Sequence, residues 1–273
     1  MYIEFKNIKS VMKFLKEHTY GHVSKDIWDC NLWFYGKVEN LNNKIFYTDK
    51  IKNIKLYKFE DVSGVLQGVA VVSYNRFCVN VYLDVLNTID LNEFFHSLLN
   101  ESENKPIWVN CCRDYVANTV IKEFNGKVNE TLSMQYYFKE DFKEDKFYNA
   151  RELTIADKDY FDYNWHHMKA SMEQGIRFFA IIENNKIISL AGLAPFSTTR
   201  AEIVCVKTKE QYRNKGFSKA LCNYVINEGF QEYSVLTWTT HCNNNKSISL
   251  SNALNFKHLI NTYQIIINRS KSV

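Results

Sequence analysis

A basic turn around Gly216 gathers the residues most suited to binding an anionic group. It lies in "AEIVCVKTKEQYRNKGFSKALCNYVINEGF", residues 201–230, where an apolar run gives way to a turn and then to helical spacing. Apolar residues from Phe217 to Val225 recur at the spacing of one helix face, so a helix is expected to begin there. A helix N-terminus presents unpaired N–H groups and a partial positive charge, which suit a phosphate. The cations around the turn are Lys207, Lys209, Arg213, Lys215 and Lys219.

Gly216 is the residue of this turn that a ligand would approach most closely. Glycine has no Cβ and adopts backbone conformations that hinder other residues, and the chain contains only nine glycines. The order of strand, basic loop and helix therefore predicts a cradle for a diphosphate. A solvated loop would have a similar composition, so the turn alone leaves both interpretations open.

The overall composition is that of a globular protein with a large core. Of the 273 residues, 46% are hydrophobic and 15% are aromatic, which excludes a disordered chain. The net charge of +4 is too small to indicate a nucleic-acid partner. The charge is unevenly distributed, since residues 1–150 carry a net charge of −1 and residues 151–273 a net charge of +5. Cations concentrated at one turn favour a compact anionic ligand over a long polyanion.

Hydropathy and cysteine spacing indicate a cytoplasmic protein without a metal site. No window offers eighteen consecutive apolar residues, so no membrane span is expected. The first eighteen residues, "MYIEFKNIKSVMKFLKEH", intersperse charges and lack a cleavage site, unlike a signal peptide. The seven cysteines form no CxxC pair and no Cys/His ladder, so no zinc site is expected. Their odd number indicates reduced thiols.

Apolar periodicity divides the chain into two α/β halves, 1–145 and 146–273. The first half predicts a helix at 10–18, strands at 44–48 and 54–59, a hairpin at 64–83, helices at 91–99 and 114–124, and strands at 106–111 and 132–138. The charge-dense segment 139–150 is interpreted as a linker. The second half predicts a helix at 159–175, strands at 177–183, 186–196 and 201–208, the helix after Gly216, a strand at 233–242, a helix at 245–254 and a strand at 262–268.

The ends of the two halves resemble each other, which predicts a tandem repeat of one αβ unit. Trp108 and Cys112 have the same spacing as Trp238 and Cys242, and a short helix and a closing strand follow each pair. The corresponding turn of the first half lies in "VYLDVLNTIDLNEFF", which is acidic and has no glycine. Only the second copy is therefore expected to bind an anion.

The turn itself resembles the acetyl-CoA-binding motif of the GNAT superfamily of N-acetyltransferases. "QYRNKGFSKAL" is similar to the motif [R/Q]-x-x-G-x-[G/A], with Arg213, Gly216 and Ser218 at the defined positions. Ser218 departs from the motif, since it is small but is neither Gly nor Ala.

A second segment extends this resemblance over residues 150–270. "NNKSISLSNALNF" is similar to the family's N-x-x-[A/S]-x-x-x-[Y]-x-x-x-G-F, with Asn244, Ser247 and Phe256 matching and Asn255 replacing the glycine. Together with the degenerate first half, the sequence "AEI…YRNKG" resembles that of a bacterial two-domain GNAT group.

The resemblance implies an α/β (α+β) fold of tandem GNAT-like domains, each a mixed, mostly antiparallel sheet flanked by helices. Residues 1–145 would form a degenerate domain and residues 146–273 the acetyltransferase domain. The sheet of the second copy would splay between its fourth and fifth strands, with acetyl-CoA as co-substrate in the gap. The residues implied in binding it are Val206, Lys207 and Thr208 along the pantetheine arm, Arg213, Asn214, Lys215, Gly216, Phe217 and Ser218 around the diphosphate, and Asn244 nearby.

The implied reaction, direct attack of an amine on the thioester, depends more on a base than on an acid. A lysine-like amine has a pKa of about 10.4, so freeing its lone pair at pH 7 costs roughly 4–5 kcal/mol. A thiolate with a pKa near 8.5 leaves much more easily. We expect Glu202 to be the base, because a Glu on this strand has that role in some GNAT branches and "AEIV" resembles their wording. The alternative is a strand-edge Glu paired with Arg200 or a lysine.

Other candidate groups lie near the expected gap. His241 is the second candidate base, with an ordinary hydrogen-bonded histidine as the alternative. Ser251 occupies the position of the family's tyrosine acid, which leaves the acid step open. His166 and His167 lie on a helix that could line the acceptor pocket, and Cys242 is either an acylated thiol or an inert one.

These observations favour an acetyl-CoA-dependent N-acetyltransferase that acts on a primary amine of a small molecule. Two alternatives stay open: a non-catalytic acyl-CoA-binding sensor or scaffold, and a tandem transferase using aminoacyl-tRNA or a long acyl-CoA. The short basic patch and the single cradle weaken the last. No nucleic-acid or membrane partner is expected. The acceptor, the role of the first half and the oligomeric state, a homodimer included, are left open.

Overall fold

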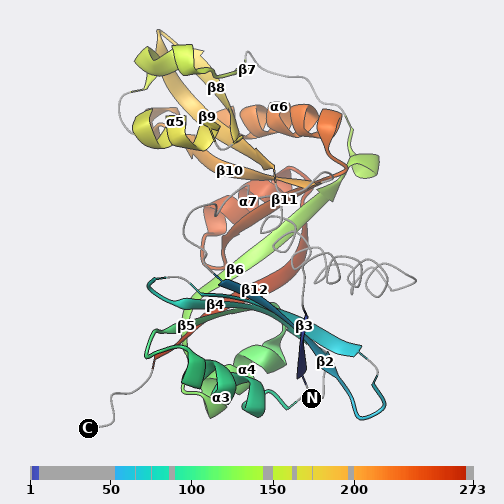
Figure 1. Ribbon diagram of the computed structural model, residues 1–273. Coiled ribbons are helices and arrows are strands. Elements are labelled where there is room, and N and C mark those ends of the chain that lie inside the picture. Colours follow the sequence, from blue (N-terminus) through green and yellow to red (C-terminus); the bar gives the residue numbers. More distant parts are fainter. Residues whose placement is uncertain are drawn as a thin grey trace. The chain divides into compact units, whose positions relative to one another are not determined.

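The chain folds into two compact units. The structure, a computed structural model, describes residues 2–5, 53–64, 66–74, 76–85, 90–143, 150–161, 165–173, 175–195 and 200–268 (Figure 1). Unit 1 consists of Met1–Ser133 and Ile260–Val273, and unit 2 of Met134–Leu259. The helix predicted at 10–18 and the strand predicted at 44–48 lie outside the described residues.

Unit 1 contains a mixed sheet with one parallel pair. Its strands, in spatial order, are β1 (Tyr2–Phe5), β2 (Asn53–Glu60), β3 (Leu66–Tyr74), β4 (Val79–Val85), β5 (Ile107–Cys111) and β12 (Lys257–Ile267). Neighbours are antiparallel except β4 and β5, which run parallel. A parallel pair needs a crossover connection, and α3 (Asn92–Glu101) lies in it, while α4 (Asp114–Glu123) follows β5.

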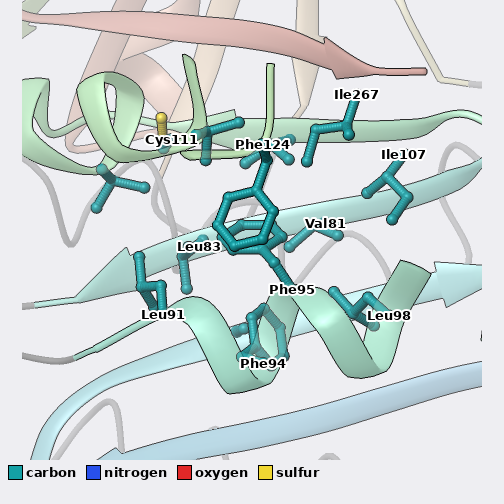
Figure 2. Packing of buried hydrophobic residues seen from close by; sticks show 14 of the residues in the cluster. Val81, Leu83, Leu91, Phe94, Phe95, Leu98, Ile107, Cys111, Phe124 and Ile267 are labelled. Carbon is teal, nitrogen blue, oxygen red and sulfur yellow. The ribbon is translucent and has the colours of Figure 1, made fainter. Parts of the chain in front are cut away.

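The core of unit 1 forms where α3 and α4 cover one face of this sheet. Phe94 and Phe95 of α3 are buried beside Leu83 of β4 (Figure 2). The ring centroids of Phe95 and Phe124 lie 5.0 Å apart, so the end of α4 packs directly on α3. Burial alternates along β5, as expected for a strand with one face on a core.

Unit 2 repeats this order of elements around a second parallel pair. Its strands, in spatial order, are β6 (Lys127–Phe138, from Met134), β11 (Val235–His241), β10 (Arg200–Thr208), β9 (Lys186–Pro195), β8 (Arg177–Glu183) and β7 (Ala150–Glu152). β7 to β10 are antiparallel neighbours, whereas β10 and β11 run parallel. The helices are α5 (Trp165–Glu173), α6 (Phe217–Glu232) and α7 (Asn245–Ala253), with short 3₁₀ helices η1 (Lys139–Asp141), η2 (Ile155–Tyr160) and η3 (Glu210–Tyr212).

The predicted fold class, a mixed and mostly antiparallel sheet with helices in a tandem arrangement, is confirmed. Both units follow the order strand, helix, parallel strand, helix: β4–α3–β5–α4 in unit 1 and β10–α6–β11–α7 in unit 2. α6 begins at Phe217, where the apolar spacing predicted it. Its buried residues Leu221 and Val225 pack with Ala201 and Ile203 of β10, which fixes that strand against the helix.

The closing strands are exchanged between the two units, so the units do not divide at the 145/146 boundary expected from the sequence. β6 begins in unit 1 and belongs to unit 2 from Met134, and β12 begins in unit 2 and belongs to unit 1 from Ile260. Within unit 1, β12 pairs with β5 from Tyr263↔Cys111 to Ile267↔Ile107. A cut after residue 145 would therefore take a strand from each unit. The assignment of residues 1–145 and 146–273 to the two GNAT-like copies stays a prediction.

Truncating Ile265 is expected to destabilise unit 1, although this residue lies at the far end of the chain. Ile265 is 0% exposed and belongs to the core of unit 1. Ile265→Ala should lower the free energy of unfolding by about 2–5 kcal/mol, measured by denaturant titration. Its half-buried neighbour Ile266 is the matched control, and Ile266→Ala should have a smaller effect. Equal effects of the two substitutions would contradict the placement of β12.

Candidate functional site

The parallel strands β10 and β11 part halfway along β10. Their register contains three pairs, Arg200↔Val235, Ala201↔Leu236 and Glu202↔Thr237. β10 continues to Thr208 and β11 to His241 without further pairing between them in the described residues. In unit 1 the corresponding pair, β4 and β5, stays in register along all of β5. The splay predicted for the second copy is therefore present in unit 2, and the first copy is closed at this place.

An irregularity in β10 lies within the splayed segment. The register between β10 and β9 shifts between Val204 and Lys207, and Cys205 has φ +56. A bulge of this kind bends a strand and increases its twist. Val206, within this irregular segment, is half-buried and packs on the core that contains α6, whereas Lys207, which follows it, is exposed. The three predicted arm-binding residues, Val206, Lys207 and Thr208, thus lie on the splayed part of β10.

The Gly216 turn opens at the end of β10 and has the geometry that an anion site needs. Gly216 has φ +84 and is the N-cap of α6, with no side chain capping the helix. A Cβ built on Gly216 would have nothing within 4 Å, so its side is open. Asn214, also exposed, has φ +60. The first turn of this 16-residue helix thus has N–H groups that no side chain caps, beside a glycine whose Cβ side is open.

Cationic and aromatic side chains of the turn contact one another and the end of β10. Arg213 donates from Nε to the carbonyl oxygen of Thr208 at 3.2 Å, which ties the middle of the loop to the end of β10. Lys215 lies with Nζ 5.6 Å from the ring centroid of Tyr212. Phe217 packs beside Tyr212, with ring centroids 6.0 Å apart. Arg213 and Lys215 are exposed, so they can approach a ligand phosphate at the turn.

Glu202 lies at the point where the two strands part. Its side chain is half-buried, and Oε2 is 3.5 Å from Oγ1 of Thr237, its register partner on β11. The carbonyl oxygen of Ala201, 3.4 Å from Thr237 Oγ1, is the alternative acceptor for the single proton of this hydroxyl. Ala201 packs in the core with α6, so alternation along the strand turns Glu202 to the opposite face. Thr237 carried no signal that marked it in the sequence, because its role depends on a cross-strand partner.

Of the other candidate catalytic residues, His241 is exposed and Ser251 is buried. His241 is exposed at the end of β11, four residues beyond Thr237 and therefore on the same sheet face as Glu202. Ser251 is 0% exposed, and its hydroxyl donates to the carbonyl oxygen of Ile248 at 2.9 Å. Because this hydroxyl proton is donated within α7, the placement of Ser251 does not support the role of general acid considered for it.

The remaining candidate residues have local partners or lie at the surface. Asn244 is exposed and caps α7, accepting from the backbone N–H of Ser247 at 3.2 Å. His166 and His167 are exposed on α5. Burial raises the pKa of the half-buried Cys242 thiol, which favours an inert thiol over a nucleophile.

An open pocket of about 590 Å³ is lined by residues 152–156, Met172 and residues 175–177, none of which belongs to the Gly216 turn or the splay. Among the described residues, no group of three or more His, Cys, Asp or Glu could hold a metal ion. No helix in the described part of the chain is long and apolar enough to cross a membrane.

The family of the chain is shown by a match to a protein-family model. The family model described as GNAT acetyltransferase matches residues 77–266, which span most of the chain. The chain belongs to the GNAT acetyltransferase family. The resemblance stated from the two sequence motifs is thereby confirmed, and the match extends across both halves of the chain.

Solved structures agree on the tandem fold of this GNAT protein. A tandem GNAT protein from the clavulanic acid biosynthesis pathway, solved without acetyl-CoA, is similar with a TM-score of 0.60 and 8% identity, covering 100% of this chain and 99% of that one. A GCN5-related N-acetyltransferase from Sphaerobacter thermophilus is similar with a TM-score of 0.62 and 10% identity, covering 100% and 98%. At such identities the likeness concerns the fold alone. No curated protein sequence matches the chain significantly.

Proposed function

We propose that this GNAT protein transfers an acetyl group from acetyl-CoA to a primary amine of a small molecule, by direct attack and at one site in unit 2. The observation that carries the proposal is the end of β10–β11 pairing at Glu202, with the open Gly216 turn at the far end of the same strand. On this proposal a carboxylate and an anion cradle would lie at opposite ends of the splayed part of β10.

The cradle end would hold the cofactor. Backbone N–H groups from Asn214 to Ser218 would bind the diphosphate, and the exposed Arg213 and Lys215 would add charge-assisted contacts. The splayed segment from Val206 to Thr208 would lie along the pantetheine arm. Asn244, which caps the helix after β11, would lie nearby. Bound acetyl-CoA supplies an activated thioester, the electrophile for the amine.

The Glu202 end would prepare the amine. Its half-buried carboxylate can accept a proton from the ammonium group directly or through one water, which frees the lone pair for attack. This step addresses the roughly 4–5 kcal/mol that deprotonating a lysine-like amine costs at pH 7. His241, on the same face, is the second candidate base. Because a thiolate with a pKa near 8.5 is a good leaving group, solvent can provide the final proton.

Release of free thiol from acetyl-CoA tests this function. The full chain is incubated with acetyl-CoA and a panel of primary amines (small aliphatic amines, amino sugars, amine antibiotics and a peptide N-terminus), and thiol is measured with a colorimetric reagent. At least one amine should raise thiol release well above the amine-free rate, with equimolar acetylated amine. Hydrolysis without acetylated amine would contradict the proposal.

A non-catalytic acyl-CoA sensor is the second candidate, and one observation favours it. Ser251 stands where the family's tyrosine acid is expected, and its hydroxyl is buried and donates within α7. A protein that kept the cradle but lost the acid could bind without turning over. Tight binding of acetyl-CoA with no acetylation over the whole amine panel would support the sensor and reject the transferase.

A further inference from the structure

We propose that the Ser218 side chain is a hydrogen-bond donor to the cofactor diphosphate, and that the buried Thr208 is the positioning residue that directs it. This inference rests on the proposed function and concerns the same site. It goes beyond the motif, which places Gly or Ala at this position and thus supplies no side-chain donor there.

Three hydroxyl groups form a continuous chain from the core to the first turn of α6. Ser189 Oγ lies 2.8 Å from Thr208 Oγ1, and Thr208 Oγ1 lies 2.7 Å from Ser218 Oγ. Ser189 is 0% exposed and Thr208 is 8% exposed, whereas Ser218 is half-buried at the helix N-terminus. Both distances are in the range of strong O–H···O hydrogen bonds.

Counting protons gives this chain a preferred direction. Three hydroxyls supply three protons and the two bonds use two, so one proton is left over, on Ser189, on Ser218, or on Thr208 if both serines donate to it. On Thr208, which is 8% exposed, the spare proton would lie in the core without a further acceptor among the described residues. If the chain ran toward Ser189, the spare proton would be in the core, where Thr208 is the one hydrogen-bond partner of the Ser189 side chain among the described residues. A buried donor without an acceptor costs about 1–3 kcal/mol. The favourable direction is therefore Ser189 to Thr208 to Ser218, with the spare proton on Ser218.

The spare proton lies where an anion is expected. Ser218 is the second residue of α6, immediately after the open side of Gly216. Thr208 also holds the loop through its carbonyl oxygen, which accepts from Arg213 Nε at 3.2 Å. Thr208 is thus bonded both to the middle of the loop and to the start of the helix. A phosphate oxygen at this helix N-terminus would be the acceptor that completes the chain.

The test compares acetyl donors with and without a diphosphate. Ser218→Ala should raise the Kd of coenzyme A roughly 10-fold, the loss expected for a hydrogen bond to a charged group, with kcat nearly unchanged. With S-acetylpantetheine, which lacks the diphosphate, kcat/KM should equal that of the parent. Thr208→Val should weaken coenzyme A binding in the same direction, and Thr208→Ser should restore it. The Kd of the double variant for coenzyme A should be no higher than that of Ser218→Ala, because both substitutions act on the same hydrogen bond from Ser218 to the diphosphate.

Controls separate this inference from the proposed function. Ser171→Ala removes the hydroxyl of a half-buried serine on α5, which donates to the carbonyl oxygen of His167, and it should leave the Kd unchanged. Thermal unfolding of each variant shows whether a weakened binder is still folded. Parent-like binding of coenzyme A by both Ser218→Ala and Thr208→Val would overturn the inference, as would an equal loss with S-acetylpantetheine. Failure of the parent itself to bind coenzyme A would instead reject the proposed function.

Discussion

Glu202→Gln is expected to lower kcat by about 10²–10⁴-fold, the usual contribution of a general base. The amide is nearly isosteric with the carboxylate and can keep the contact with Thr237, but it cannot accept the amine's proton. The affinity for coenzyme A should be unchanged, because Glu202 lies where the strands part and the cradle lies at the other end of β10. Steady-state kinetics with the best amine and calorimetric binding of coenzyme A measure the two quantities.

A pH series and a matched glutamate strengthen this test. The deficit of Glu202→Gln should narrow between pH 7 and pH 9, because an amine with a pKa near 10.4 supplies more of its own free base as pH rises. Glu183→Gln removes an exposed carboxylate at the end of β8 and should leave kcat unchanged. A parent-like kcat in Glu202→Gln would show that Glu202 is not the general base, and His241→Gln would be the next variant to measure.

Gly216→Glu is expected to weaken coenzyme A binding by at least roughly 100-fold. The new side chain would occupy the open side of the turn and place a negative charge beside the diphosphate. Two unit charges about 4 Å apart near a protein surface interact by about 4 kcal/mol. A stability cost of about 1–2 kcal/mol is also expected, because φ +84 is unfavourable for a residue with a Cβ.

Gly64 provides a control with the same backbone strain. It has φ +79, and a Cβ built there would also meet nothing within 4 Å, but it lies between β2 and β3 in unit 1. Gly64→Glu should cost similar stability and leave the Kd for coenzyme A as in the parent. Comparable losses of binding in the two glutamate variants would show that strain or net charge, and not the cradle, governs affinity.

Local features of the sequence were enough to predict the glycine turn and the start of α6, whereas the binding of a diphosphate there stays a prediction. A positive φ favours glycine, apolar spacing marks the start of α6, and cations cluster on the adjacent loop, so each part could be found within 30 residues. The splay followed from the family resemblance and is confirmed in the register of β10 and β11. The order of elements in each unit was also predictable, since apolar periodicity is local to each strand and helix.

Contacts between distant residues were not predictable in this way. The charge-dense segment 139–150 suggested a boundary at 145/146, whereas the compact units change over within β6 and β12, and the pairing of β12 with β5 joins segments more than 100 residues apart. Ser251 stands at the position of an acid in the motif that the sequence resembles, yet only the structure shows that its hydroxyl donates to the carbonyl oxygen of Ile248. The chain of hydroxyls through Ser189 depends on the pairing of β9 with β10.

The stoichiometry of coenzyme A binding tests the single cradle of unit 2 most directly. Isothermal titration of the full chain with coenzyme A should give one molecule bound per chain, because β10 and β11 part in unit 2 while β4 and β5 stay paired in unit 1. The same titration of Gly216→Glu should show little heat. Two molecules bound per chain, or no heat with the parent protein, would contradict a diphosphate site at the N-terminus of α6.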